Sequence, residues 1–172
     1  MIEIIKAMME RRSISKFKPE MPHKEQIEQI IEAGLYAANG RGKQATITVA
    51  VTNKALRDQL AKANCKIGGW DDGFDPFYSA PVILIVLADK SWPIRVYDGS
   101  LVMGNMLLAA HSLGLGSIWI HRAKSARMER GLSRLVASDQ CQSTGRADTL
   151  SGQCGYVASA GGCETTYQGV TQ

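Results

Sequence analysis

Long apolar runs are missing from this chain of 172 residues. A transmembrane helix needs about 20 apolar residues, whereas the longest apolar run, over residues 80–88, has the length of a buried strand. No long apolar segment follows the N-terminal charges, as a secretory signal would require. Aromatic residues make up only 6%, and the net charge of +4 comes from scattered cations, which argues against a nucleic-acid-binding face. We expect a cytoplasmic protein with neither a membrane nor a nucleic-acid partner.

Metal-ligand spacing and the common catalytic motifs are also absent. No C-x-x-C pair and no shared histidine spacing occurs among the seven candidate ligands, Cys65, Cys141, Cys154, Cys163, His23, His111 and His121. In a reducing compartment the cysteines are expected to be free thiols. The chain contains no G-x-G-x-x-G, no P-loop lysine motif and no G-x-S-x-G. We therefore predict no metal site and no catalytic residue.

Apolar periodicity predicts alternating helices and strands. Helices are expected over residues 2–11, 23–38, 53–64 and 98–113, and strands over 45–51, over 81–87 and from 118. The strand at 81–87 is almost continuously aliphatic and should be central in its sheet. Small residues within 98–113 favour close helix packing, as at a buried interface. The pattern indicates an α+β or α/β domain.

A basic cluster at residues 11–17, with the sequence RRSISKF, is the most distinctive local feature. It combines three cations with two hydroxyl groups, and an arginine can bind a phosphate through two parallel hydrogen bonds. The cluster is therefore a candidate phosphate site. A solvated basic turn at a helix end is the alternative, and these seven residues alone do not decide between them.

Two other places carry open alternatives. His121 follows an apolar strand, and strand ends commonly contact ligands, although a structural role explains it equally well. The loop at 66–79 carries four aromatic residues that either line a substrate slot by stacking or pack the loop itself, namely Trp70, Phe74, Phe77 and Tyr78.

Four sequence blocks, taken in order, resemble the nitroreductase family of flavin enzymes. They are RRSISKF at 11–17, AANGRGKQ at 37–44, DPFYSAP at 75–81, and the run from DGSLVMGNMLLAA at 98–110 into GLGSIWIHRAK at 114–124. One block alone would be a weak signal, but their order over residues 1–124 is specific.

This resemblance implies a fold, a cofactor and a reaction. The fold would be α+β, a mixed sheet flanked by helices, in a homodimer whose long central interface helix spans 98–110. The cofactor would be FMN, held in the dimer interface. Hydride would pass from NADH or NADPH through the flavin to nitroaromatics, quinones or similar small-molecule electron acceptors. The cofactor performs the redox step, so the missing catalytic motifs are expected.

The resemblance also assigns roles to the basic cluster. By position, Arg11, Arg12 and Ser13 match contacts to the FMN phosphate and ribityl chain. Ser15 stands where relatives usually have a second basic residue, which removes one phosphate partner, and Lys16 is the nearest cation that could replace it.

Five further residues match positions near the flavin ring. Asn39, Gly40 and Gln44 correspond to the loop that meets the flavin from the partner subunit. His121 and Arg122 occupy the position beside the isoalloxazine ring, where backbone groups form hydrogen bonds near its reactive nitrogen.

Composition changes abruptly after Lys124. Residues 125–172 contain no Lys, Pro, Phe or Ile and are rich in Gly, Ser, Thr and Gln, a composition typical of poorly ordered sequence. Relatives end in a buried strand with a G-x-x-x-L-G-Y-like run and a basic arm, of which GQCGY at 152–156 is a faint counterpart. We therefore divide the chain into a nitroreductase-like FMN-binding domain, 1–124, and an atypical C-terminal segment, 125–172, that lacks the sheet strand and the basic arm.

Two explanations of this tail remain open, translation out of frame and a natural variant. Read one base downstream, the codons for 162–169 force Lys or Arg at two junctions and permit Pro between them, as a basic arm would need. In both cases we expect weaker FMN retention. The alternative functions are a non-catalytic flavin- or ligand-binding dimer on the same fold, and a structural dimer without a ligand.

Overall fold

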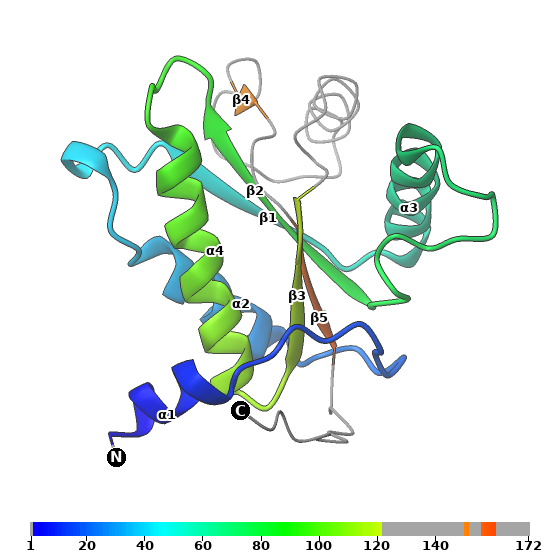
Figure 1. Ribbon diagram of the computed structural model, residues 1–172, viewed down its shortest axis with the longest axis horizontal. Helices are drawn as coiled ribbons and strands as arrows, with labels where there is room; N and C mark the ends of the chain where they lie inside the picture. Colours follow the sequence, from blue (N-terminus) through cyan, green and yellow to red (C-terminus); the bar gives the residue numbers. More distant parts are fainter. Residues whose placement is uncertain (1, 122–149, 152–155, 161–172) are drawn as a thin grey trace, which may run out of the picture.

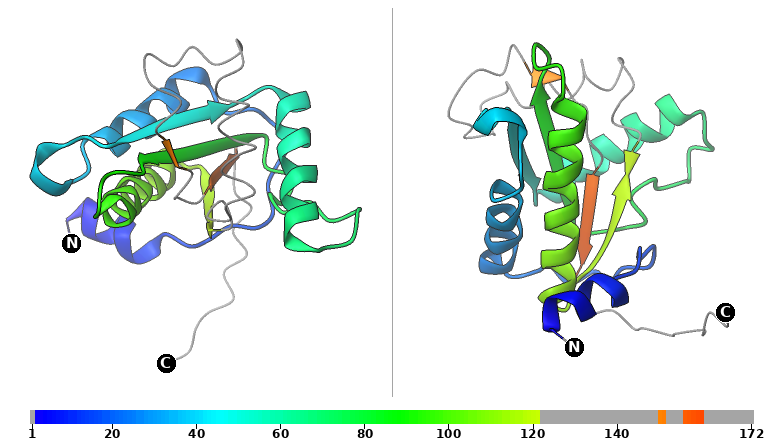
Figure 2. Two further views of the ribbon diagram at one scale, coloured as in Figure 1. Left: turned by 90° about the horizontal axis from the view of Figure 1, so that it is seen from above. Right: turned by 60° about the vertical axis from the view of Figure 1, so that its left-hand side comes forward.

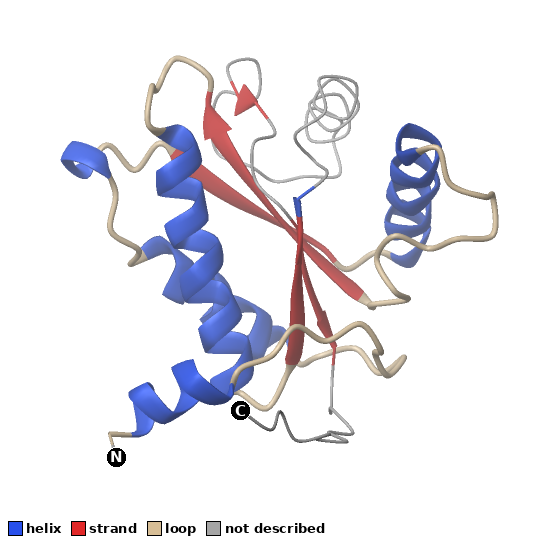
Figure 3. Cartoon of the chain, viewed as in Figure 1, coloured by secondary structure: helices blue, strands red, loops and turns tan. Residues whose placement is uncertain are grey.

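The computed structural model describes residues 2–121, 150–151 and 156–160, which form one sheet with helices on both faces (Figure 1). Arg122 and most of the C-terminal segment lie outside the described residues. Figure 3 separates the helices from the strands. The elements in chain order are α1 (Glu3–Glu10), α2 (Lys24–Leu35), the 3₁₀ helix η1 (Gly40–Gly42), β1 (Thr46–Val51), α3 (Lys54–Gly68), β2 (Val82–Asp89), α4 (Arg95–Ser112), β3 (Gly116–Ile120), β4 (Leu150–Ser151) and β5 (Tyr156–Ala160).

The helices and strands predicted up to residue 121 are present, with shifted ends. The largest shift is at α3, which continues to Gly68, four residues beyond the expected end. Gly69 stops it in the left-handed conformation at φ 68° and donates its N–H to Cys65 O, a common way to end a helix. The α+β class is confirmed.

The sheet has the strand order β1-β2-β5-β3, with β4 also pairing with β2. Each of these pairings is antiparallel. Within the described residues, the parallel component expected of a mixed sheet is the isolated bridge between Ser13 and Ser117. This bridge ties the basic cluster to the first half of β3.

The strand expected to be missing from the C-terminal segment is present. The backbone of β5 pairs with Val82–Ile85 of β2 on one side and with the whole of β3 on the other. That prediction was wrong because it averaged composition over 48 residues, whereas a strand needs only about five.

The position of β2 between two hydrophobic cores explains why its sequence is almost continuously aliphatic. Its side chains alternate between two cores, one under α2 and α4 that includes Leu84, and one under α3 that includes Ile85. Residues 82–88 are all buried, and each large side chain contributes about 1.5–3 kcal/mol when fully removed from water. In Figure 2, α4 and α3 lie on opposite sides of the sheet. The central position predicted for this strand is confirmed.

The helix α1 and the outer side of α4 leave apolar side chains exposed. The helix α1 has no buried residue, and Met8, Met9, Tyr97 and Leu101 are between 48% and 71% exposed. Apolar surface gathered in one region of a folded chain commonly marks an interaction site. Within the described residues, no helix is both long and apolar enough to cross a membrane.

Candidate functional site

Arg11 ends α1 and carries an unsatisfied cationic group. Its backbone N–H closes the helix on Ala7 O at 3.0 Å. Its side-chain Nη1 is buried and has no hydrogen-bond partner among the described residues. A buried donor without an acceptor costs free energy, more so when it is charged. The group that Arg11 lacks is an acceptor, and an anionic oxygen is the strongest one.

The neighbouring Arg12 has a different local role. Its Nη1 donates to Met9 O at 2.6 Å and to Arg11 O at 2.9 Å. These carbonyls belong to the C-terminal turn of α1, where a cation is favourable because of the helix dipole. The two arginines, adjacent in sequence, are therefore not equivalent: Arg12 caps the helix, whereas Nη1 of Arg11 finds no acceptor within the ranges that the structure describes.

Backbone contacts fix the cluster beside β3. Ser13 bridges to Ser117, and Ile14 N donates to Ser117 O at 3.1 Å. The Oγ of Ser117 is buried without a partner in the described part of the chain, so this hydroxyl joins Arg11 as a second unsatisfied group on the linked segments. The side chains of Ser13 and Ser15 are exposed. Sequence reasoning missed Ser117, although a serine within the apolar strand GSIWI was a usable signal.

The loop at 39–44 is closed by its own side chains. Asn39 Oδ1 accepts from Gln44 N at 3.0 Å, and Gly40 N donates to Asp98 Oδ1 at 2.9 Å. Arg41 and Gln44 have positive φ values, 56° and 48°, in a region that residues other than glycine rarely adopt. The loop therefore has a defined shape and is anchored to the first turn of α4.

Within a single chain, the 39–44 loop lies far from the basic cluster. Asp98 holds the loop at the N-terminal end of α4, whereas α1 lies beside Asn105 and Ser112 near the other end, across a groove of about 620 Å³. An 18-residue helix is about 27 Å long, and Figure 1 shows the separation. The predicted site is thus divided between the two ends of α4.

His121 directly follows β3, and its side chain is exposed. Its ring meets Trp119 edge to face, with centroids 6.1 Å apart. The strand β3 therefore carries Ser117 near its start and His121 just past its end. Arg122 lies outside the described residues, so its predicted position beside His121 stays a prediction.

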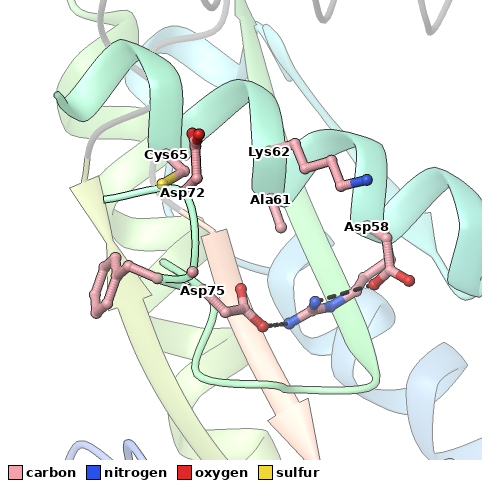
Figure 4. A pocket seen from close by; sticks show the side chains of 9 residues that line it. Asp58, Ala61, Lys62, Cys65, Asp72 and Asp75 are labelled. Atoms are coloured by element: carbon pink, nitrogen blue, oxygen red, sulfur yellow. Dashed lines mark hydrogen bonds and ion pairs between the residues drawn. The ribbon is translucent and has the colours of Figure 1, made fainter. Parts of the chain in front are cut away.

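A second hollow lies between α3 and the loop at 70–79, and its volume is about 260 Å³. Arg57 is one of the residues that line it and pairs with Asp58 and Asp75, both labelled in Figure 4, where dashed lines mark the two interactions. Hydrogen bonds from Lys54 and then Arg57 lower the pKa of Asp58 below its ordinary value. The ion pair between Arg57 and Asp75 holds the loop at 70–79 against α3.

Of the four aromatic residues of the 66–79 loop, one packs in the core and the other three contact one another in a row. Phe77 is fully buried in the core under α3, so the packing interpretation holds for it. Trp70 and Phe74 meet edge to face at 5.0 Å, and Phe74 and Tyr78 at 6.4 Å. Phe74 and Tyr78 are exposed. Across the described ranges, no group of three metal-ligating side chains is found.

Two curated relatives are identical to this chain at more than a quarter of the aligned positions. A protein of Methanothermobacter thermautotrophicus, named as an NADH dehydrogenase/NAD(P)H nitroreductase, is 29% identical over 122 residues, covering 69% of this chain and 60% of that protein. The FMN reductase [NAD(P)H] of Bacillus subtilis is 26% identical over 140 residues, covering 69% and 53%. The chain thus spans between half and two thirds of the length of these relatives.

Solved structures share the fold over the whole chain. A nitroreductase with bound FMN from Bacteroides fragilis has a TM-score of 0.85 at 21% identity and covers 100% of this chain and 95% of that one. A nitroreductase with bound FMN from Desulfitobacterium hafniense has a TM-score of 0.80 at 25% identity, with the same coverage. The family model for the nitroreductase family matches residues 8–67 and 73–136. This chain therefore belongs to the nitroreductase family.

Proposed function

We propose that this chain is an FMN-dependent oxidoreductase that passes hydride from NADH or NADPH to nitroaromatic, quinone or similar acceptors in the cytoplasm. The observation that carries the proposal is the buried Nη1 of Arg11, which has no hydrogen-bond partner in the described part of the chain. A terminal phosphate supplies the anionic oxygen that this group lacks. Family membership and the similarity to FMN-binding structures support FMN as the source of that phosphate.

The residues present fit such a group. Arg11 would hold the phosphate, with Ser13, Ser15 and the hydroxyl of Ser117 close along the same segments. Bound FMN would supply the hydride chemistry. The part of this chain would be to bind and orient it.

We further propose a homodimer, because the site is divided within one chain. A two-fold dimer places equal patches face to face. If α4 crosses its symmetry mate in antiparallel fashion, the 39–44 loop of one subunit approaches the Arg11 end of the other. The exposed apolar side chains of α1 and α4, among them Met8 and Leu101, would be buried by this contact. Asn39, Gly40 and Gln44 would then meet the cofactor of the partner.

The pair Arg11→Gln and Arg12→Gln tests the phosphate site, since both variants lose one charge. A charge-assisted hydrogen bond contributes about 1.5–3 kcal/mol, so Arg11→Gln should weaken FMN binding about 10- to 100-fold. Arg12→Gln should weaken it less, because the Nη1 of Arg12 caps α1. The measurement is quenching of flavin fluorescence on titration, followed by NADH and NADPH oxidation with a quinone acceptor.

Equal losses in the two variants would contradict the assignment of Arg11. Wild-type protein that bound no FMN would overturn the proposed function. Tight FMN binding without nicotinamide oxidation above that of free FMN would instead establish the non-catalytic flavin-binding alternative.

A further inference from the structure

A single buried carboxylate joins the 39–44 loop to the helix α4. Asp98 is 3% exposed and lies in the first turn of α4. Its Oδ1 accepts from Gly40 N at 2.9 Å, and its Oδ2 accepts from Trp92 Nε1 at 2.7 Å. One oxygen therefore holds the loop, and the other is held by the segment that precedes α4.

Close packing at Gly40 reinforces this connection. A Cβ at Gly40 would overlap Ile94 Cδ1 and lie 3.2 Å from Trp92 Cζ2. The backbone of the loop thus lies directly against two side chains, Trp92 and Ile94, that precede α4. A larger residue at this position would force the Ile94 side chain to move, and Gly40 N is at the same time the donor to Asp98.

The loop needs an external anchor to keep its shape. Arg41 and Gln44 both have positive φ values, which are unfavourable for residues with a Cβ. The loop has local hydrogen bonds, from Gln44 N to Asn39 Oδ1 and from Lys43 N to Gly40 O, and Asp98 ties it to a segment 58 residues away. Loss of that acceptor should release the loop into a wider set of conformations.

We infer that Asp98 is a positioning residue for the cofactor site, with Trp92 orienting its carboxylate. This inference rests on the proposed function, in which Asn39, Gly40 and Gln44 meet the cofactor of the partner subunit. If only a fraction of the molecules keeps the loop in its binding shape, the apparent affinity falls by that fraction. Asp98 therefore affects FMN affinity without touching FMN.

A purely structural role for Asp98 has to be separated from this one. An acidic side chain in the first turn stabilises a helix through the dipole alone. Trp92→Phe separates the two roles, because it keeps the charge of Asp98 and an aromatic side chain while it removes the indole N–H donor; the smaller ring also fills less of the space beside Gly40. Asp98→Asn is the complementary variant: an amide has one acceptor oxygen, so either Gly40 N or Trp92 Nε1 loses its partner.

The experiment uses the full chain and two readouts. Hydrogen exchange of the peptide covering residues 37–45 is measured in the flavin-free protein, and the FMN dissociation constant is measured by fluorescence titration. In Asp98→Asn and Trp92→Phe, we expect exchange at Gly40 to accelerate and the dissociation constant to rise about tenfold. Val51→Ala, in the core under α3, is the control for a general loss of stability, compared at equal melting temperature.

Unchanged exchange at residues 37–45 in both variants would overturn the inference, as would equal weakening of FMN binding in Val51→Ala. Wild-type protein that bound no FMN would refute the proposed function instead. In that case the exchange measurement on the flavin-free protein still decides whether Asp98 holds the loop.

Discussion

The carboxylate of Asp75 determines the conformation of the turn at residues 75–80. It accepts hydrogen bonds from Phe77 N and Ser79 N, both at 2.9 Å, and pairs with Arg57. Because Tyr78 and Ser79 have positive φ values, the turn depends on these contacts. Asp75→Asn removes the negative charge from these two hydrogen bonds and from the ion pair. We therefore expect the free energy of unfolding to fall by about 1.5–3 kcal/mol, which urea denaturation at pH 7 measures.

The control for this prediction is Asp72→Asn, which removes the same charge from an exposed position of the same loop. Substitutions at such positions usually change stability by less than about 0.5 kcal/mol. Equal losses in the two variants would mean that net charge, and not the bonding of Asp75, stabilises the turn.

The pH dependence of stability can be predicted at Asp58. Hydrogen bonds from Lys54 at 2.6 Å and from Arg57 at 3.2 Å lower the pKa of Asp58 in the folded chain. A lowered folded pKa adds stability above the unfolded value of about 3.9, and this stability disappears as the pH falls through the folded pKa. Asp58→Asn should therefore be less stable than wild type at pH 7 and converge with it in acid. Urea denaturation across this range is the measurement, and a gap that widened in acid would contradict the assignment.

At the scale of elements, α2 and α4 pack closely where α2 has a glycine. A Cβ at Gly34 would lie 2.9 Å from Met106 Cγ and 3.2 Å from Val102 Cγ1. Gly34→Ala should destabilise the chain, because overpacking costs about 1–3 kcal/mol and the gain in helix propensity is at most about 1 kcal/mol. Thermal unfolding of the variant measures the net effect.

A double variant tests the cause of that loss. Met106→Ala opens space that the new methyl group can enter, so Gly34→Ala combined with Met106→Ala should cost at least about 0.5 kcal/mol less than the sum of the single variants. Strict additivity would show that the loss does not arise from contact between the new methyl group and Met106.

Apolar periodicity was sufficient to predict most elements, because local spacing determines which face of a helix or strand is buried. The run at 81–87 predicted a central strand, and the strand β2 (Val82–Asp89) is buried on both faces. The strand β5 was missed because a five-residue segment carries little weight within a tail of unusual composition. Contacts between distant residues had no local signal: Asp98 and Gly40 are 58 residues apart.

For the candidate site, the sequence could name segments but not the contacts within them. The order of the motifs selected the basic cluster and the 39–44 loop. It could not distinguish Arg11 from Arg12, because their difference arises from the end of α1. There the guanidinium of Arg12 turns back to the helix carbonyls, whereas Nη1 of Arg11 is buried without a hydrogen-bond partner among the described residues. Ser117 emerged only when β3 was paired with the cluster.

At the scale of the whole molecule, the proposed dimer makes cofactor binding depend on assembly. Leu101 is 48% exposed on α4, and Leu101→Arg would place a charge in the apolar contact between subunits. We expect this variant to elute as a monomer in size-exclusion chromatography with light scattering, and to lose FMN because the partner's 39–44 loop is missing. Gln59→Arg, which adds the same charge on the exposed side of α3, should keep both the dimer and the flavin. A Leu101→Arg monomer that retained FMN at wild-type affinity would show that each chain builds a complete site, and a wild-type monomer would refute the divided site altogether.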